Sequence, residues 1–310
     1  MTGLRITGWG TALPDKVITN HDLAQSVDTS DEWITERTGI KERRVGGSTM
    51  SLSVEAGRKA MESAGVDPSE IDLVVLSTTT PDRQVPATAS SVQRELGLDC
   101  GAFDINAACS GFVYGLVIAN GFLKSGLKKI LVIGTDTLSR ITDWEDRNTC
   151  ILFADGSGAV VVEATDDAGD LLGFHMSSDG TLEDSLYAEI GETLHMDGRA
   201  VFKNAVLVME EAARQAMAQA GVTADDIAVV IPHQANIRII EASCKRLGIP
   251  ADKALTVLHY TGNTSSASVP LAMVDGIDHN RIKNGDLVLM VGFGAGMTSA
   301  AALLRWSADT

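Results

Sequence analysis

The sequence has few cysteines and aromatic residues, and it contains no long unbroken apolar segment. Its four cysteines are too widely separated to predict a disulfide framework or a zinc site. No apolar stretch approaches the roughly 20 residues that a membrane-spanning helix requires. The first residues, Met1–Gly8, have the pattern of a strand, without the basic segment and apolar stretch of a signal peptide. We therefore expect a cytoplasmic protein with reduced thiols.

Positive charge is also scarce. The chain has 25 Lys and Arg residues against 41 Asp and Glu residues, which gives a formal net charge of −16. Nucleic acids select basic surfaces, so a nucleic-acid partner is not expected, and an acidic partner would need a local basic patch. The histidines include no pair at an interval of one or four residues. A metal site therefore has little support.

The clearest positive feature of the sequence is an internal repeat. Residues 55–66 (EAGRKAMESAGV) match residues 211–222 (EAARQAMAQAGV), and the match continues without a gap from residues 67–75 to residues 223–231. Each copy predicts an Ala-rich helix that ends at glycine, then an acidic turn and a buried strand. Alanine-rich helices resemble one another by chance, but the ungapped extension through turn and strand argues against coincidence.

The repeat predicts the fold class. Continuous runs of β-branched residues that alternate with helices are typical of mostly parallel strands covered on both faces. A chain of 310 residues, 45% of them hydrophobic, is long enough for one duplicated core. We therefore predict an α/β fold of two pseudo-symmetric halves, residues 1–166 and 167–310, with no long linker between them.

Cys109 is the first candidate functional residue, because it lies between an apolar run and the next predicted helix, in FDINAACSGF. A thiol at a helix N-terminus lies in the field of unpaired N–H groups, which favours the thiolate. We expect this field and a nearby imidazole to lower the thiol pKa by about 2 units, which requires roughly 2.7 kcal/mol. For an isolated cysteine, however, burial as a small hydrophobic residue is the more common role.

His233 and Asn263 are the residues that the repeat relates to Cys109. His233 follows the second copy of the repeated strand, and Asn263 lies about 30 residues later, near the point that corresponds to Cys109. Ligands of open α/β sheets bind beyond the carboxyl ends of strands, where all three residues fall. Separately they can be a core thiol, a hydrogen-bonded imidazole and a turn asparagine. Together they predict one pocket.

Three motifs carry a family resemblance: AACSG at 107–111, PHQANIR at 232–238 and GNTSSAS at 262–268. With DTSDEWI at 28–34 and GFGAG at 292–296, they resemble β-ketoacyl-acyl-carrier-protein synthase III, a thiolase-fold condensing enzyme. Chalcone synthases, elongating synthases with two histidines, and hydroxymethylglutaryl-CoA synthases with a catalytic glutamate fit less well. The resemblance implies a layered αβαβα arrangement of mixed, mostly parallel sheets.

The resemblance also implies an acyltransferase that initiates fatty acid synthesis. Cys109 would take the acyl group of an acyl-CoA, by default acetyl-CoA, in a ping-pong reaction. Malonyl-acyl-carrier-protein would then lose carbon dioxide, with His233 and Asn263 stabilising the enolate, and give 3-oxoacyl-acyl-carrier-protein. The backbone N–H groups of Cys109 and Ala295 match the family's oxyanion hole. The glycines around Ala295 lack the spacing of a nucleotide-binding loop.

The expected coenzyme A site begins on a predicted helix capped by Ser30 or Asp31, where Trp33 and Arg37 share a face. By resemblance, Trp33 and Arg147 flank the adenine and Arg37 lies near the phosphates. From the residues alone, a packed tryptophan with surface ion pairs is the simpler interpretation. A weaker correspondence lines the pantetheine tunnel with Ile151, Gly198, Phe202 and Asn236.

The resemblance further implies protein partners. Arg238 and Lys245 lie seven residues apart on one face of a predicted helix, with Arg246 adjacent, where the family docks its carrier protein. Such a basic stripe can also be a merely solvated surface. Val85 stands where some relatives have phenylalanine, on a loop that caps the acyl pocket of the neighbouring subunit of a homodimer. The smaller residue would admit longer or branched acyl groups.

Two alternatives stay open at this stage. A paralogue of secondary metabolism would transfer the acyl group from Cys109 to an oxygen, a nitrogen or a different carbon nucleophile. A catalytically silent scaffold subunit would keep the fold, but such subunits commonly lose the nucleophile. This chain retains Cys109, His233 and Asn263.

Overall fold

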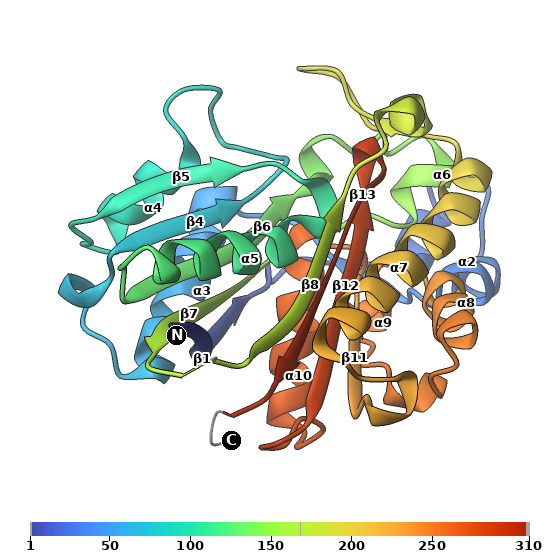
Figure 1. Cartoon of the computed structure of the whole chain (residues 1–310). Coiled ribbons are helices and arrows are strands. Elements are labelled where there is room, and N and C mark those ends of the chain that lie inside the picture. The colour runs from blue at the N-terminus through green and yellow to red at the C-terminus, as the bar shows by residue number, and fades with distance from the viewer. Residues whose placement is uncertain (1, 168, 308–310) are drawn as a thin grey trace.

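Within residues 2–167 and 169–307, which the computed structural model describes, two large sheets lie side by side (Figure 1). The first has the strand order β1-β7-β6-β4-β5 and the second has the order β11-β12-β13-β8. The strands of the first sheet are β1 (Gly3–Ala12), β4 (Leu73–Ser77), β5 (Gly101–Ile105), β6 (Lys129–Thr137) and β7 (Asp155–Thr165). Those of the second are β8 (Leu171–Ser177), β11 (Val229–Pro232), β12 (Leu287–Gly294) and β13 (Thr298–Arg305). Small ribbons pair β2 (Val17–Thr19) with β3 (Glu42–Arg44), and β9 (Leu186–Tyr187) with β10 (His195–Met196).

Helices cover both outer faces and also separate the sheets (Figure 1). Helices α3 (Thr49–Ala64) and α4 (Thr88–Glu95) share an apolar core with the first sheet. Helices α5 (Gly111–Lys124) and α10 (Ser268–Asp278) share the central core with strands of both sheets. Helix α7 (Gly198–Ala220) packs on the second sheet with α8 (Ile237–Leu247) beside it. This αβαβα layering confirms the predicted fold class. The short helices are α1 (Asn20–Leu23), α2 (Asp31–Thr38), α6 (Arg147–Cys150) and α9 (Leu258–Thr261).

Strand direction agrees with the prediction of mixed, mostly parallel sheets. Strand β4 runs parallel to β5 and β6, and β11 runs parallel to β12. Strand β7 is antiparallel to both β1 and β6, and β13 is antiparallel to both β8 and β12. Strands β1 and β8 therefore point the same way as the parallel strands of their sheets, and only β7 and β13 run against them. Helices cover both faces of these sheets, so these two strands also appear as continuous apolar runs in the sequence.

The internal repeat appears in the structure as a repeated close contact between a strand and a helix. Strand β1 crosses α3 at Gly8, where an added Cβ would lie 2.4 Å from the carbonyl oxygen of Ala60. Strand β8 crosses α7 at Gly173, where a Cβ would lie 2.2 Å from the carbonyl oxygen of Ala216. Ala60 and Ala216 occupy equivalent positions of the sequence repeat. The same glycine contact therefore seats a helix on each sheet.

The substitution Gly173→Ala tests this packing. It is expected to lower the free energy of unfolding by about 2–3 kcal/mol, because β8 or α7 must shift to admit a methyl group against backbone. Gly121→Ala on α5 is the matched control, since nothing lies within 4 Å of the added Cβ. That variant is expected to gain about 0.5–1 kcal/mol from the helix preference of alanine. Urea unfolding followed by circular dichroism measures both, and equal effects would contradict the packing.

Candidate active site

Cys109 lies at the turn between β5 and α5, where the two sheets meet. Ala108 has a φ of +46°, a left-handed conformation that turns the chain sharply just before the thiol. Strand β12 of the other sheet reaches this turn at Gly294, where an added Cβ would lie 2.5 Å from the backbone nitrogen of Cys109. A larger residue at 294 would displace the turn, so glycine is required for this contact.

His233 follows β11 and is 1% exposed. Its Nδ1 lies 2.6 Å from Oγ of Ser268, the first residue of α10. Its ring meets the ring of Phe293 edge to face, with 5.4 Å between the centroids. These contacts leave Nε2 as the nitrogen without a hydrogen-bond partner among residues 2–167 and 169–307.

Asn263 is held by its backbone and by one side-chain oxygen. Its N–H donates to the carbonyl of Leu152, and its carbonyl accepts from the N–H of Ala154, each at 2.9 Å. Its Oδ1 accepts from the backbone N–H of Ser265 at 3.0 Å. Because a backbone N–H can only donate, this contact identifies the oxygen of the amide. The NH₂ group is therefore the end of the side chain that remains available as a donor.

The structure brings these three residues together. Cys109, His233 and Asn263 line one cavity of about 120 Å³, which the repeat had predicted from their positions at strand ends. Two aromatic residues that were given no role from the sequence, Phe153 and Phe293, also line it. Phe293 lies within the GFGAG motif, but a phenylalanine at either position looks like ordinary core.

Burial determines the charges in this cavity. It raises the pKa of the Cys109 thiol to about 12 and lowers the pKa of His233 to about 3, because the thiolate and the imidazolium both lose hydration. Both groups are therefore neutral at pH 7. The expectation of a lowered thiol pKa is wrong for this structure. Desolvation outweighs the helix terminus, a neutral imidazole adds no positive charge, and the nearby Asp136 raises the pKa further.

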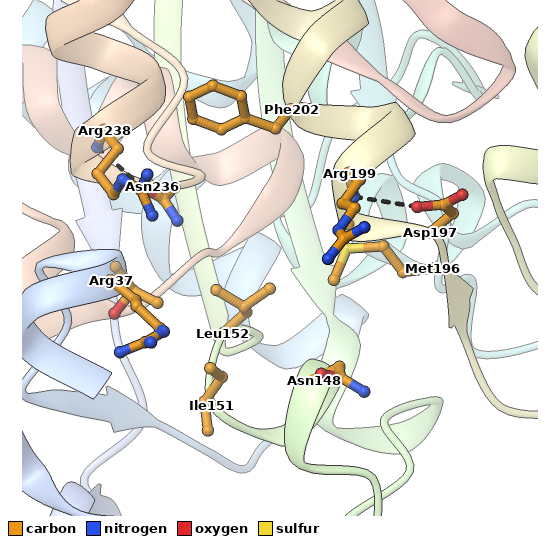
Figure 2. Close-up of a pocket in the computed structure, with 12 residues that line it drawn as sticks. Arg37, Asn148, Ile151, Leu152, Met196, Asp197, Arg199, Phe202, Asn236 and Arg238 are labelled. Carbon is orange, nitrogen blue, oxygen red and sulfur yellow. Dashed lines mark hydrogen bonds between the residues drawn. The ribbon is translucent and has the colours of Figure 1, made fainter. Parts of the chain in front are cut away.

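A larger cavity of about 830 Å³ opens at the surface (Figure 2). Five residues line both this outer cavity and the inner one, so the two adjoin each other: Leu152, Met196, Gly198, Phe202 and Asn236. The outer cavity is also lined by Ile151 and Arg37, so every residue predicted for the pantetheine tunnel lies on this path. Figure 2 shows Arg199, which the sequence reasoning missed, across the cavity from Arg37 and Arg238.

The residues expected to bind adenine form a cluster at the edge of this cavity. The guanidinium carbons of Arg37 and Arg147 lie 4.4 Å and 4.8 Å from the centroid of the Trp33 ring, within the range of cation–π attraction. Helix α2, which carries Trp33 and Arg37, is capped by Ser30, one of the two predicted caps. Arg147 also donates to the carbonyl of Asp28 at 2.8 Å.

A second cavity beside Cys109 has a volume of about 440 Å³. Ala295, the predicted second member of the oxyanion hole, lines it together with Cys109. The other lining residues are mostly apolar and include Leu138, Ile141, Phe153, Leu186 and Leu194. Cys109 thus lines both a narrow cavity that adjoins the outer one and a mostly apolar cavity that reaches exposed residues, among them Tyr187 and Ala188.

The predicted docking residues are divided between two places. Arg238 lines the mouth of the outer cavity, with its guanidinium carbon 5.6 Å from the Phe202 ring centroid. Lys245 and Arg246 are exposed on α8, and Arg246 forms an ion pair with Glu210 of α7. The three basic residues therefore differ in their surroundings and do not form one continuous exposed stripe. The predicted gate, Val85, is 82% exposed on the loop that precedes α4.

The cysteines form no disulfide bonds, and all four are free thiols. Across residues 2–167 and 169–307, no cluster of three or more His, Cys, Asp or Glu side chains could hold a metal ion. None of the helices in that part of the chain is long and apolar enough to cross a membrane.

Comparison with known proteins identifies the family. The profile described as 3-oxoacyl-[acyl-carrier-protein] synthase III matches residues 103–180, and the profile of its C-terminal part matches residues 217–306. A beta-ketoacyl-[acyl-carrier-protein] synthase III from Roseiflexus castenholzii is 46% identical over 98% of both chains. The chain belongs to the 3-oxoacyl-[acyl-carrier-protein] synthase III family. Since these are acyltransferase-type condensing enzymes, the predicted family and enzyme class are confirmed.

Solved structures of this synthase family are closely similar to the chain. The 3-oxoacyl-[acyl-carrier-protein] synthase III of Aquifex aeolicus is 47% identical with a TM-score of 0.96, covering 98% of this chain and 100% of that chain. The priming β-ketosynthase of the R1128 polyketide biosynthetic pathway is 38% identical with a TM-score of 0.93, covering 99% and 97%. The solved relatives thus include one from a polyketide biosynthetic pathway.

The reactivity of Cys109 towards iodoacetamide tests its protonation state. Because burial raises the thiol pKa to about 12, the alkylation rate is expected to rise roughly tenfold per pH unit from pH 7 to 9, in proportion to the thiolate fraction. Mass spectrometry of the peptide that contains Cys109 measures the rate, and Cys109→Ala is the control for assignment. A plateau below pH 8 would show a lowered pKa and contradict the dominance of burial.

Proposed function

We propose that this synthase condenses an acyl-CoA starter, acetyl-CoA by default, with malonyl-acyl-carrier-protein to give 3-oxoacyl-acyl-carrier-protein and initiate fatty acid synthesis. The observation that carries the proposal is the cavity in which Cys109 faces two neutral donors, His233 and Asn263. In this proposal residues 1–166 supply the nucleophile and residues 167–310 supply the donors. The enzyme acts in the cytoplasm and uses coenzyme A thioesters as substrates, with no metal or other cofactor.

The first half-reaction is acyl transfer to Cys109. Its sulfur forms a bond to the acyl carbon, the bond to the CoA sulfur breaks, and the thiol proton goes to the departing CoA sulfur. Because the resting thiol is neutral, the proton leaves as the new bond forms. The backbone N–H groups of Cys109 and Ala295 stabilise the oxyanion of the tetrahedral intermediate.

The second half-reaction is decarboxylation followed by carbon–carbon bond formation. The bond between the malonyl carboxylate and its methylene carbon breaks, carbon dioxide leaves, and the electron pair becomes an enolate. The enolate oxygen accepts hydrogen bonds from His233 and Asn263, which burial keeps free of competing water. The methylene carbon then bonds to the acyl carbon, and the acyl–sulfur bond breaks. The Cys109 thiolate that results takes up a proton from solvent.

The outer cavity suits the long arm that both substrates share. In our proposal, adenine inserts between Trp33 and Arg147, so Arg147 must move off the ring that it covers in this structure. Arg37 binds the phosphates at the mouth. The pantetheine arm then passes Asn236 and Phe202 to reach Cys109, along the residues common to the outer and inner cavities.

We propose that the carrier protein docks on α8 beside this mouth. Arg238 at the opening and the exposed Lys245 would meet an acidic carrier surface, whereas Arg246 is already engaged by Glu210. The strongly negative protein otherwise repels such a partner. Local positive charge at the entrance would therefore orient the carrier protein.

We also propose a homodimer through the edge of the first sheet. Strand β5 ends that sheet, and its Phe103 packs against the partly exposed Phe122 of α5, with 6.1 Å between the ring centroids. An open strand edge with apolar neighbours is a surface that a second subunit can cover. Val85 of one subunit would then close the 440 Å³ acyl cavity of the other. Valine leaves more space there than phenylalanine, which favours longer or branched starters.

One alternative function retains a specific argument. The R1128 relative is a priming ketosynthase of polyketide biosynthesis, so a role in secondary metabolism fits the same fold. Transfer of the acyl group to an oxygen or nitrogen nucleophile would not require two donors aimed at an enolate. The presence of both His233 and Asn263 in the cavity therefore favours decarboxylative condensation. A silent scaffold is disfavoured because the thiol and both donors are in place.

Two assays on one set of variants test the proposal. Intact mass spectrometry after incubation with acetyl-CoA is expected to show one added acetyl group, which Cys109→Ala abolishes. Asn263→Asp and His233→Ala should still be acetylated but should release carbon dioxide from malonyl-acyl-carrier-protein roughly 10²–10³-fold more slowly, because a donor to the enolate is lost. Acetylation without any 3-oxoacyl product in the wild type would favour simple acyl transfer, and equal loss in both assays would contradict the assigned roles.

A charge reversal tests the docking surface. Lys245→Glu is expected to raise the KM for malonyl-acyl-carrier-protein several-fold at low salt and to leave the KM for acetyl-CoA unchanged, because Lys245 lies outside the cavity. Lys203→Glu on α7, also exposed and outside the cavity-lining residues, controls for the change in net charge. Steady-state kinetics with each substrate varied separately measures both effects. Equal changes in the two KM values would contradict docking at Lys245.

A further inference from the structure

We infer that Ser268 is a positioning residue that holds the His233 imidazole in the tautomer with its proton on Nε2, so that a donor faces the catalytic cavity. The hydrogen-bond geometry at the start of α10 carries this inference. Its catalytic consequence rests on the proposed function, in which His233 donates to an enolate oxygen.

Two contacts determine the hydrogen bonding of the Ser268 hydroxyl. Its Oγ lies 2.6 Å from His233 Nδ1 and 3.3 Å from the backbone nitrogen of Gln234. Ser268 is fully buried and His233 is 1% exposed, so solvent does not supply alternative partners. Since the N–H of Gln234 can only donate, Oγ accepts that bond. The hydroxyl proton has one acceptor in reach within residues 2–167 and 169–307, which is Nδ1.

This arrangement distinguishes the two tautomers. With the proton on Nε2, the Ser268 hydroxyl donates to Nδ1 and every polar group in the contact has a partner. With the proton on Nδ1, the ring would donate to Oγ, and the hydroxyl proton would be buried without an acceptor. Buried donors without partners are strongly disfavoured in proteins. The Nε2–H tautomer is therefore the one that this site selects.

The backbone on which this depends is itself fixed. The side-chain amide of Gln234 donates to the carbonyls of Pro232 and Leu255 at 2.7 Å and 3.1 Å, and its Oε1 accepts from the N–H of Val257 at 2.9 Å. These bonds hold the chain on both sides of His233. The N–H of Gln234 is thus kept directed at Ser268, where its hydrogen bond occupies one lone pair of Oγ.

In the proposed reaction, the tautomer decides whether His233 presents an N–H donor or a lone pair to the enolate oxygen. A neutral imidazole with its proton on Nε2 offers a donor beside the NH₂ group of Asn263, whose oxygen is occupied by Ser265. The opposite tautomer would direct a lone pair at the developing negative charge. Acylation of Cys109 does not use this donor, so the effect of Ser268 falls on decarboxylation.

The test compares Ser268→Ala with Ser266→Ala in the full-length protein. Ser266 is the matched control, because its hydroxyl is fully buried two residues away and has no hydrogen-bond partner among the described residues. With ¹⁵N-histidine labelling, NMR should show a protonated Nε2 and an unprotonated Nδ1 for His233 in the wild type and in Ser266→Ala. Ser268→Ala should show a mixture or the reverse. The His233→Ala spectrum assigns the signal.

Kinetics provide the second readout. Ser268→Ala is expected to slow carbon dioxide release from malonyl-acyl-carrier-protein roughly 10–100-fold while acetylation of Cys109 stays within about twofold of the wild type. Wild-type His233 with its proton on Nδ1 would overturn the inference even if Ser268→Ala does not fold. An unchanged tautomer in Ser268→Ala, or equal loss of both half-reactions, would also overturn it. Failure of the wild type to release carbon dioxide would instead refute the proposed function, while the NMR result would still decide the role of Ser268.

Discussion

The geometry of the candidate site depends on one buried carboxylate, that of Asp136 near the end of β6. Its Oδ1 accepts from the hydroxyls of Thr78, Thr79 and Thr80, and its Oδ2 accepts from the backbone N–H of Ser266 at 3.1 Å. A buried charge without such partners would cost several kcal/mol, so these bonds are what allow the carboxylate to remain inside. They tie the first sheet to the loop that carries Asn263 and Ser268. They thereby hold Asn263 and Ser268 close to the sheet whose last strand leads to Cys109.

Charge is distributed in opposite ways at the two ends of the substrate path. Arg37, Arg199 and Arg238 gather at the mouth of a protein whose net charge is −16, whereas the inner cavity combines a neutral thiol, a neutral imidazole and an amide. Local cations at the entrance attract phosphates. In the proposed reaction, the negative charge of the malonyl carboxylate passes to the enolate oxygen, which needs hydrogen-bond donors with little reorganisation. The interior would therefore stabilise this charge through fixed dipoles, whereas the entrance would attract phosphates through charged side chains.

The repeat and the motifs predicted much of this structure, including the layering and the convergence of Cys109, His233 and Asn263. Which strands run against the others, β7 and β13, was not predictable, because buried strands of either direction have the same apolar pattern. The thiol pKa was also missed, since desolvation depends on packing that local sequence does not contain. Ser268 lies within the GNTSSAS motif, which contains several hydroxyl side chains. Only the fold shows that the hydroxyl of Ser268 is the one that reaches the imidazole of His233, 35 positions away. Arg238 and Arg246 look equivalent in sequence and differ because Glu210 lies beside only one of them.

Cys109 lines two cavities, and its sulfur is the point from which the length of an acyl group is counted. Under the proposed reaction, the starter extends from the sulfur into the 440 Å³ apolar cavity, whereas the malonyl group arrives through the 120 Å³ cavity. A starter longer than the apolar cavity would push its carbonyl away from the backbone donors beside the thiol. The length of that cavity then selects the starter. A change in this length would alter the choice of starter without altering the chemistry at the sulfur.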